Sequence, residues 1–193
     1  MTFRVCVYCG SRHGVRASYA AAARAIGAEI GRRGWQLVYG GGRVGLMGEA
    51  ADAALAAGAR VVGVIPQTLR EREVGHLGLH ELHVVPTMHL RKQMMAERAD
   101  AFVALPGGIG TLEELYEVWT WRQLGYHDQP IGLLNVDGYY DALLRFMSRS
   151  VDEGFLAPTQ HALLQVDTDP AALLDRLHRL AASGGREDDY SRI

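Results

Sequence analysis

Short apolar runs alternate with helix-like segments along most of this chain, and this alternation constrains the fold more than any other feature. Each run is apolar at nearly every position, which is typical of a strand buried on both faces of a parallel sheet. The expected strands cover residues 3–8, 35–39, 60–65, 82–85, 101–104, 131–134 and 163–166. The expected helices cover residues 15–33, 87–98, 139–153 and 170–182, with others running from the glycine runs to about 58 and 124.

This order predicts an α/β fold, a Rossmann-like doubly wound parallel sheet flanked by helices. The 193 residues are 48% hydrophobic, enough for one substantial core, and no change in composition divides them. We therefore expect a single domain over residues 1–182 and a disordered polar tail over 183–193. Residues 66–80 have no clear period and are expected to form a loop with room for one helical turn.

Charge and hydropathy limit the partners that this chain is expected to have. A formal net charge of −2 gives no electrostatic reason to expect binding to nucleic acid or to a membrane surface. The first apolar run is too short for a signal peptide, and no later run approaches the length that spans a membrane. We expect a cytoplasmic protein that binds neither nucleic acid nor membranes.

Cysteine and histidine give no indication of a metal or redox site. Cys6 and Cys9 form a lone C-x-x-C, but Cys6 lies inside an apolar run rather than at a strand-to-helix turn. A structural role is expected for both, because free cysteine behaves as a small buried hydrophobe. Four histidines between residues 76 and 89 lack the helical spacing with a carboxylate that metal ligands show, so no metal site is expected.

The stretch from Leu105 to Glu114, LPGGIGTLEE, ends an apolar run and leads into a helical segment. Glycines let the backbone approach an anion closely, and the first N–H groups of a helix carry the positive end of its dipole. The stretch therefore predicts a phosphate-binding loop beside a carboxylate. The spacing Thr111-x-x-Glu114 also fits a capping box, in which Thr111 caps the helix and Glu114 reaches back to the N-cap amide. Capping and catalysis both stay open for Glu114.

A second glycine run, Gly40-x-Gly42-x-x-Gly45, also follows an expected strand and fits the dinucleotide fingerprint. That fingerprint needs an acidic residue about twenty positions later to hold the ribose, and residues 60–65 contain none. NAD is therefore not expected, and a Walker A loop is excluded because no Gly-Lys-Ser/Thr occurs. The glycines either allow close helix–strand packing or form a second wall of a mononucleotide site.

Arg91 and Lys92 lie one turn into a helix that Thr87 is expected to cap. Such a basic pair either covers a solvated face or contacts a phosphate or leaving group, for which a guanidinium is suited. The chain has nineteen arginines, and Lys92 is its single lysine. Any mechanism that needs a lysine must therefore use Lys92.

The helix after the first glycine loop is apolar on more than one side, and such a helix is normally covered on both. We infer a homodimer whose interface lies near the active site. The apolar residues are Leu112, Leu115 and Trp119 on one face, and Val118 and Trp121 on the side of Glu114.

Several motifs occur together in a fixed order. The signature PGGxGTxxE spans Pro106 to Glu114, and the others are VCVYCGS at 5–11, YGGG at 39–42, GLMG at 45–48, MHLRK at 88–92, TWRQLG at 120–125 and LLNVDGYY at 133–140. In these motifs the chain resembles the LOG ("Lonely Guy") family of cytokinin-activating nucleoside 5′-monophosphate phosphoribohydrolases, which is also labelled lysine-decarboxylase-like.

The resemblance implies a dimeric, Rossmann-like enzyme that needs no cofactor. Such an enzyme hydrolyses the N-glycosidic bond of a cytokinin riboside 5′-monophosphate, or of AMP, to the free base and ribose 5-phosphate. The catalytic pair falls on Arg91 and Glu114. Glycosidic cleavage passes through an oxocarbenium-like state, which Glu114 would stabilise while orienting or deprotonating water. Arg91 would neutralise the departing base or hold the substrate.

The resemblance also implies which residues bind the substrate, and most of them lie in the motifs given above. They are Ser11, Gly41, Gly42, Glu73, Lys92, Gly107, Gly108, Gly110, Thr111 and Glu113. The glycine loop and Thr111 would anchor the 5′-phosphate. Residues 67–80 depart from the plant pattern and Glu73 aligns only loosely, so the preferred base is not determined.

Two other functions are weighed against the hydrolase. A lysine decarboxylase that uses pyridoxal phosphate needs a Schiff-base lysine, and Lys92, beside the expected catalytic arginine, is the only candidate. A nucleotide or pterin-cofactor carrier would use the two glycine loops without turnover. Arg91 and Glu114 together favour the enzyme.

Overall fold

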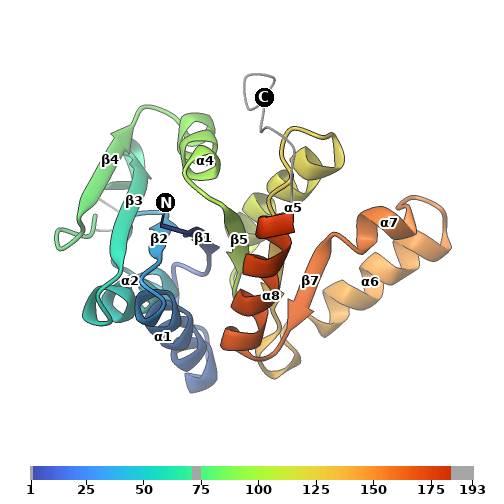
Figure 1. Cartoon of the computed structure of the whole chain (residues 1–193), viewed down its shortest axis with the longest axis horizontal. Coiled ribbons are helices and arrows are strands. Elements are labelled where there is room, and N and C mark those ends of the chain that lie inside the picture. Colours follow the sequence, from blue (N-terminus) through green and yellow to red (C-terminus); the bar gives the residue numbers. More distant parts are fainter. Residues whose placement is uncertain (1, 71–74, 184–193) are drawn as a thin grey trace.

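The structure is a computed structural model that describes residues 2–70 and 75–183. Its centre is a seven-stranded sheet in the order β4-β3-β2-β1-β5-β6-β7 (Figure 1), with all neighbouring strands parallel. The strands are β1 (Arg4–Tyr8), β2 (Gln36–Tyr39), β3 (Arg60–Pro66), β4 (Glu81–Val85), β5 (Ala101–Ala104), β6 (Ile131–Leu134) and β7 (Leu164–Asp167). The predicted doubly wound parallel sheet is confirmed.

The strand order reverses between β1 and β5. The chain runs outward from β1 through β2 and β3 to β4, and then returns to place β5 on the other side of β1. The two strands pair in register, with Tyr8 beside Ala104, so their carboxyl ends stop at the same level. In a doubly wound sheet the loops that leave such a switch point diverge and leave a crevice.

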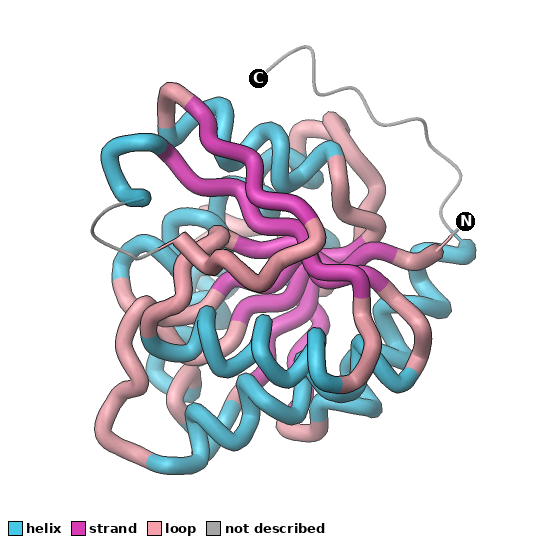
Figure 2. The backbone as a smooth tube through the Cα atoms, turned by 90° about the vertical axis from the view of Figure 1, so that its left-hand side faces the viewer, coloured by secondary structure: helices cyan, strands magenta, loops and turns pink. Residues whose placement is uncertain are grey.

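Helices cover both faces of the sheet, and the strands run through the middle of the molecule (Figure 2). Buried residues of α1, α2 and α8 form the core on one face, and those of α4, α5 and α6 form it on the other. The helices are α1 (Ala17–Arg32), α2 (Gly45–Ala56), α3 (Gln67–Arg70), α4 (Met88–Glu97), α5 (Ile109–Gln123), α6 (Asp141–Asp152), α7 (Pro158–His161) and α8 (Pro170–Ser183), with a short 3-10 helix, η1, at Val136–Gly138.

The expected strands and long helices are all present, with ends that differ by a residue or two. Thr87 caps α4 as predicted, since its Oγ1 accepts a hydrogen bond from the Leu90 amide at 3.2 Å. The single helical turn expected after Pro66 is α3. Ser183, placed in the predicted polar tail, instead ends α8, and residues 184–193 lie outside the described part of the chain.

The apolar sides of α5 are covered within the same chain. Leu115, Val118, Trp119 and Trp121 are all buried, and the Trp119 indole donates a hydrogen bond to the Gln160 carbonyl at 3.0 Å. These residues therefore do not require a second subunit, and the sequence pattern from which we inferred a homodimer is explained by the packing of α5 in the core.

Within the ranges 2–70 and 75–183, none of the helices combines the length and the apolar character needed to cross a bilayer.

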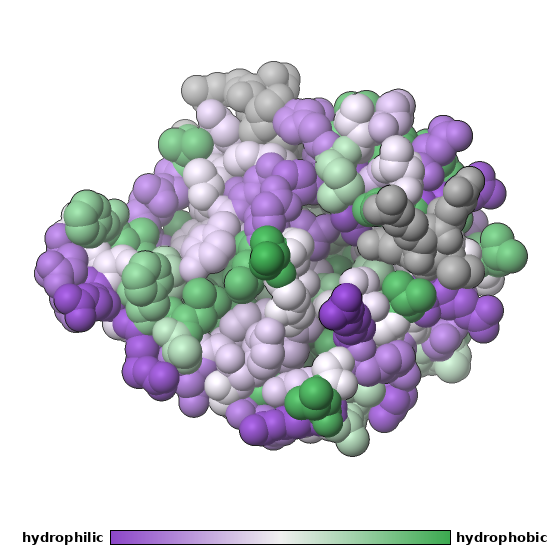
Figure 3. Space-filling model, turned by 180° about the vertical axis from the view of Figure 1, so that it is seen from behind, coloured by the Kyte–Doolittle hydropathy of each residue, from purple (hydrophilic) through white to green (hydrophobic). Residues whose placement is uncertain are grey.

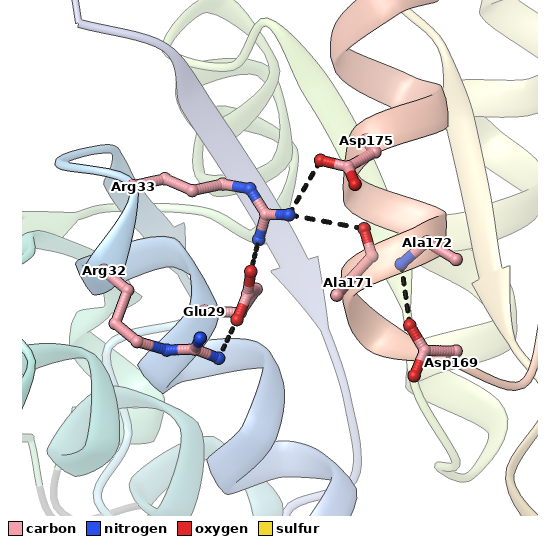
Figure 4. Close-up of polar contacts among 7 residues, drawn as sticks. All are labelled: Glu29, Arg32, Arg33, Asp169, Ala171, Ala172 and Asp175. Atoms are coloured by element: carbon pink, nitrogen blue, oxygen red, sulfur yellow. Dashed lines mark hydrogen bonds and ion pairs between the residues drawn. The ribbon is translucent and has the colours of Figure 1, made fainter.

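An ion-pair network joins the C-terminal end of α1 to α8 (Figure 4). The carboxylate of Glu29 is buried between Arg32 and Arg33. Arg33 also contacts the Asp175 carboxylate at 2.7 Å, and its guanidinium lies 5.1 Å from the ring centre of Trp35. Because Arg33 is only 17% exposed, it acts as a bridge between the two helices rather than as a surface charge.

We expect Arg33→Ala to lower the free energy of unfolding by about 1–3 kcal/mol, because it leaves the buried Glu29 with one partner fewer. Urea denaturation measures the change. The control is Arg149→Ala, which removes an exposed pair with Glu153 and should cost about 0.5 kcal/mol or less. Equal effects of the two substitutions would contradict a special role for the Arg33 bridge.

Candidate active site

A cavity of about 630 Å³ opens at the carboxyl ends of β1, β2 and β5, at the switch point of the sheet. Its walls come from the β1–α1 loop, the start of α2, the inner face of α4 and the β5–α5 loop. The lining residues are 7–14, Tyr19, Gly40, Leu46, Met47, Met88, Arg91, Met95, 106–111, Glu113, Glu114 and Tyr139. The volume is in the range that holds a mononucleotide-sized ligand.

Arg91 and Glu114 face each other in this cavity. Arg91 Nη1 lies 3.3 Å from Glu114 Oε1, and its Nε donates a hydrogen bond to the Val64 carbonyl at 3.2 Å. Both residues are buried, at 7% and 8% exposure. A buried charge is tolerated only with partners, so the end of β3 and the carboxylate of α5 together hold the guanidinium in place.

Gly40 makes room for the guanidinium. A Cβ at this position would lie 2.1 Å from Arg91 Nη2, so a side chain at the end of β2 would displace the arginine from the cavity. The first glycine of the second run is thus explained by the close approach of a functional side chain.

Glu114 does not cap its helix. The N-cap of α5 is Gly108, which makes no side-chain capping hydrogen bond, and the helix begins at Ile109. Thr111 is therefore already inside the first turn, and Glu114 lies beyond the reach of the N-cap amide. The capping-box interpretation was wrong, because Gly108, three residues before the expected N-cap Thr111, is the N-cap and the helix starts earlier. Glu114 contacts Arg91 and lines the cavity.

The PGG loop is fixed at one end and open at the other. The Gly10 amide donates to the Pro106 carbonyl at 3.1 Å, and a Cβ on Gly107 would clash with Thr111 Oγ1 and the Gly10 amide. At Gly108 and Gly110, by contrast, a Cβ would meet no atom within 4 Å. The packing therefore requires Gly107, whereas the other two glycines leave space above the first, unpaired N–H groups of α5.

The structure brings together most of the residues expected to bind the substrate. Ser11, Gly107, Gly108, Gly110, Thr111 and Glu113 line the cavity beside Arg91 and Glu114. Gly41, Gly42 and Lys92 are not among the lining residues, and Glu73 lies outside the described residues. Their roles toward a substrate stay predictions.

Gly41 has a local structural reason to be glycine, and Gly42 makes a backbone contact. Gly41 has φ +75°, and a Cβ there would lie 2.9 Å from Leu82 Cδ1. Its carbonyl accepts a hydrogen bond from the His76 amide at 3.0 Å, and Gly42 forms an isolated antiparallel bridge with Gly75. This part of the second glycine run thus shapes the connection from β2 to α2 and its contact with the segment before β4.

Lys92 points to α5 rather than into the cavity. Its ammonium contacts the carboxylates of Glu113 at 2.5 Å and Glu117 at 2.8 Å, and its side chain is 13% exposed. Burial alone would lower the pKa of Lys92, but the hydrogen bonds that it donates to the two carboxylates raise its pKa above the usual value. Lys92 is therefore held charged between α4 and α5.

The cysteine thiols are buried and uncharged. Cys6 lies inside β1 and Cys9 just after it, and both are free. Burial raises the pKa of both thiols well above the ordinary range, with the Glu114 carboxylate acting in the same direction. Cys9 is part of the cavity floor, but a neutral buried thiol is a poor nucleophile.

Three of the histidines of residues 76–89, His76, His80 and His83, have structural partners. His76 Nε2 lies 2.9 Å from an Asp52 carboxylate oxygen, and His80 Nδ1 accepts from the Val61 amide at 3.2 Å. Among the residues that the structure describes, no group of three or more His, Cys, Asp or Glu is arranged to hold a metal ion.

Several lining residues were not anticipated. Arg12, His13 and Gly14 follow Ser11 on the loop after β1, so their order in the chain already pointed to the cavity rim. Tyr19, from the first turn of α1, and Tyr139, from the loop after β6, line the wall near the PGG loop. Neither tyrosine carries a local signal for such a position.

Comparisons with known proteins show the family of this chain. A protein-family model described as "Possible lysine decarboxylase" matches residues 47–177. A cytokinin riboside 5′-monophosphate phosphoribohydrolase of Arabidopsis thaliana is 49% identical over 178 residues, which are 92% of this chain and 83% of that protein. A probable enzyme of the same name from Oryza sativa subsp. japonica is 51% identical over 174 residues, 90% of this chain and 71% of that protein.

Solved structures share the fold at lower identity. The molybdenum cofactor carrier protein of Chlamydomonas reinhardtii has a TM-score of 0.73 and 22% identity, and the match covers 95% of this chain and 100% of that chain. The molybdenum cofactor binding protein of Rippkaea orientalis has a TM-score of 0.69 and 19% identity, covering 93% and 98%. At such identities the likeness shows the fold alone.

The family model and the relatives both extend across most of the chain, and the relatives are about half identical to it. This chain belongs to the LOG family, the family of the cytokinin riboside 5′-monophosphate phosphoribohydrolases.

Proposed function

We propose that this chain is a hydrolase that cleaves the N-glycosidic bond of cytokinin riboside 5′-monophosphates, of AMP, or of both. The products are the free base and ribose 5-phosphate. The observation that carries the proposal is the buried pair of Arg91 and Glu114 in a cavity beside the PGG loop. The names of relatives with about 50% identity support the same reaction.

The 5′-phosphate binds at the N-terminus of α5. Open space at Gly108 and Gly110 lets phosphate oxygens reach the first amides of the helix, and its dipole favours a negative charge there. Thr111 lies in the same turn, and Ser11 and Arg12 face it from the loop after β1. Binding energy at this remote phosphate orients the ribose toward the pair of Arg91 and Glu114.

The reaction replaces one bond at C1′ with another. The C1′–N bond breaks with its electron pair leaving on the base, and positive charge develops on the ribose. Glu114 either stabilises this charge or removes a proton from the water whose oxygen bonds to C1′. Arg91 either neutralises the departing base or holds the substrate. The nitrogen of the base takes up a proton, and ribose 5-phosphate remains.

The label of lysine decarboxylase does not fit this chain. A Schiff-base enzyme needs a lysine that faces its substrate and can lose its proton. Lys92, the single lysine, is bound to Glu113 and Glu117, and it is not among the residues that line the cavity. The enzyme is a glycoside-cleaving hydrolase and not a decarboxylase.

A carrier of a nucleotide or pterin cofactor is the alternative on this fold. The carrier proteins among the solved structures support only the shared fold, because their identity is below 25%. The Arg91–Glu114 pair favours turnover, since backbone amides alone suffice to hold a phosphate. The two functions differ in whether free base appears.

A cytoplasmic location and the absence of nucleic-acid or membrane partners stay predictions from composition and charge.

We also propose that the protein is a homodimer with the active site near its interface. Met88, Leu90 and Ile109 are 41%, 42% and 87% exposed, and Met88 and Ile109 line the cavity. Exposed apolar residues that lie close together are typical of protein interfaces. Figure 3 shows the molecule from behind, where hydrophobic residues lie among hydrophilic ones.

Incubation of the purified protein with AMP and, separately, with isopentenyladenosine 5′-monophosphate should release the free base and ribose 5-phosphate. Chromatography of the products measures both. The ratio of the two rates gives the base preference. Binding of both nucleotides without release of base would favour the carrier.

Glu114→Gln should reduce the rate of base release at least about 100-fold, because the amide can neither take a proton nor stabilise positive charge as a carboxylate does. The amide oxygen can still accept from Arg91, so the melting temperature should change little. The matched control is Glu153→Gln, which makes the same change at an exposed carboxylate. A folded Glu114→Gln protein with a near-normal rate would remove Glu114 from the mechanism.

Light scattering should give a mass twice the 21.1 kDa of one chain. Ile109→Asp should shift the mass toward that of one chain, because it places a charge in the proposed interface. Phe155→Asp changes a residue that is 90% exposed and is not among those lining the cavity, so it should leave the mass unchanged. A wild-type mass of one chain would exclude the dimer.

A further inference from the structure

The loop from β6 to α6 reaches across to the PGG loop. The Tyr139 hydroxyl donates a hydrogen bond to the Gly107 carbonyl at 2.6 Å, and the Tyr140 hydroxyl donates to the Leu105 carbonyl at 2.7 Å. Two successive tyrosines therefore hold two carbonyls at the start of the loop. This is possible because β6 lies beside β5, so the segments that follow the two strands are neighbours.

The two tyrosines are themselves fixed by a built turn. The side-chain oxygen of Asn135 accepts from the Tyr140 amide at 2.8 Å, and its amide donates to Asp141 at 2.7 Å. Asp137 and Gly138 have φ of 51° and 69°, which reverses the chain. The motif from Asn135 to Asp141 thus has a structural reason at most of its positions, and the two tyrosine rings emerge from it toward the PGG loop.

Tyr139 and Tyr140 occupy different environments. Tyr139 is 43% exposed and lines the cavity, and its ring meets Tyr19 edge to face at 5.5 Å. Tyr140 is 2% exposed, and burial raises the pKa of its hydroxyl. Tyr140 is not among the lining residues, so its hydroxyl acts on the loop without a path to a ligand in the cavity.

We propose that Tyr139 and Tyr140 are positioning residues that set the PGG loop for phosphate. In a trans peptide the carbonyl and the next N–H point in opposite directions, so holding the Gly107 carbonyl also orients the Gly108 amide. A carbonyl oxygen turned toward the phosphate would repel it, and three glycines give the loop freedom to turn that way. Tyr139 removes that freedom at the Gly108 amide before the ligand arrives. Tyr140 instead fixes the Leu105 carbonyl where the loop leaves β5, because the next residue, Pro106, has no N–H to orient.

This inference rests on the proposed function at one point, the placement of phosphate at the start of α5. It adds that affinity for the phosphate depends on hydroxyl groups that need not touch it. The consequence is specific to the phosphate. Ligands without phosphate should bind equally well whether or not the loop is held.

The experiment compares the variants Tyr139→Phe and Tyr140→Phe with a control, Tyr116→Phe. The Tyr116 hydroxyl contacts Met147 Sδ at 3.1 Å instead of the PGG loop. Calorimetry measures Kd for ribose 5-phosphate, which carries no base for the proposed reaction to release, and for adenosine with each protein. We expect Kd for ribose 5-phosphate to rise about 10-fold in Tyr139→Phe and at least about 3-fold in Tyr140→Phe. Kd for adenosine should stay within about 2-fold, and Tyr116→Phe should match the wild type.

Several results would overturn the proposal. Unchanged Kd values for ribose 5-phosphate in both variants would show that the loop does not need the hydroxyls. A rise in Tyr139→Phe alone would show that Tyr139 touches the ligand rather than positions the loop. An equal rise for adenosine would show general loss of structure, which melting temperatures of the variants would also reveal.

Because the measurement is of binding, it separates the positioning role from the proposed hydrolysis. Phosphate-dependent weakening in both variants of a protein that releases no base would support the positioning role while removing the hydrolase. Normal binding by the variants of a protein that does release base would overturn the positioning role alone.

Discussion

The buried guanidinium of Arg91 is the constraint on which the site depends. A charge out of water is stable only where partners replace its hydration. Here the Val64 carbonyl of β3 and the Glu114 carboxylate of α5 are partners, and Gly40, just after β2, leaves the necessary space. The pair of Arg91 and Glu114 is therefore a property of the whole sheet edge. A shift of any one of these elements would leave the guanidinium or the carboxylate buried without its partner.

The two glycine runs look alike in the sequence but have different physical causes. In the second run, Gly40 leaves room for the guanidinium of an arginine, and Gly41 needs a positive φ. In the PGG loop, Gly107 is required by contact with Thr111 and Gly10, whereas none of the described residues occupies the space at Gly108 and Gly110. Where neither packing nor conformation requires a glycine at a helix N-terminus, a ligand that approaches the backbone is the remaining cause.

The sequence predicts the order of the elements well because continuous apolar runs and capping residues such as Thr87 are local signals. It fails where the cause is not local. Thr111 and Glu114 fit a capping box by spacing, but the N-cap of α5 is Gly108. Because glycine has no side chain that could cap a helix, the sequence gives no signal for a helix start there. The hydrogen bond from Tyr139 to Gly107 joins residues 32 positions apart, through the adjacency of β5 and β6. The four-residue helix α7 is too short to show a period.

The charge on Glu114 bears on the choice between turnover and carriage. In the proposed phosphate-binding cavity the Glu114 carboxylate would repel the ligand, and burial strengthens that repulsion. In a carrier this repulsion would weaken ligand binding and accelerate no reaction. In glycosidic cleavage the reacting carbon becomes positive, so the same carboxylate favours the transition state over the bound ground state. Arg91 offsets the repulsion before reaction. The pair therefore favours bond cleavage more than it opposes binding of the ligand. The fold is compatible with either function, and the carboxylate is what distinguishes them.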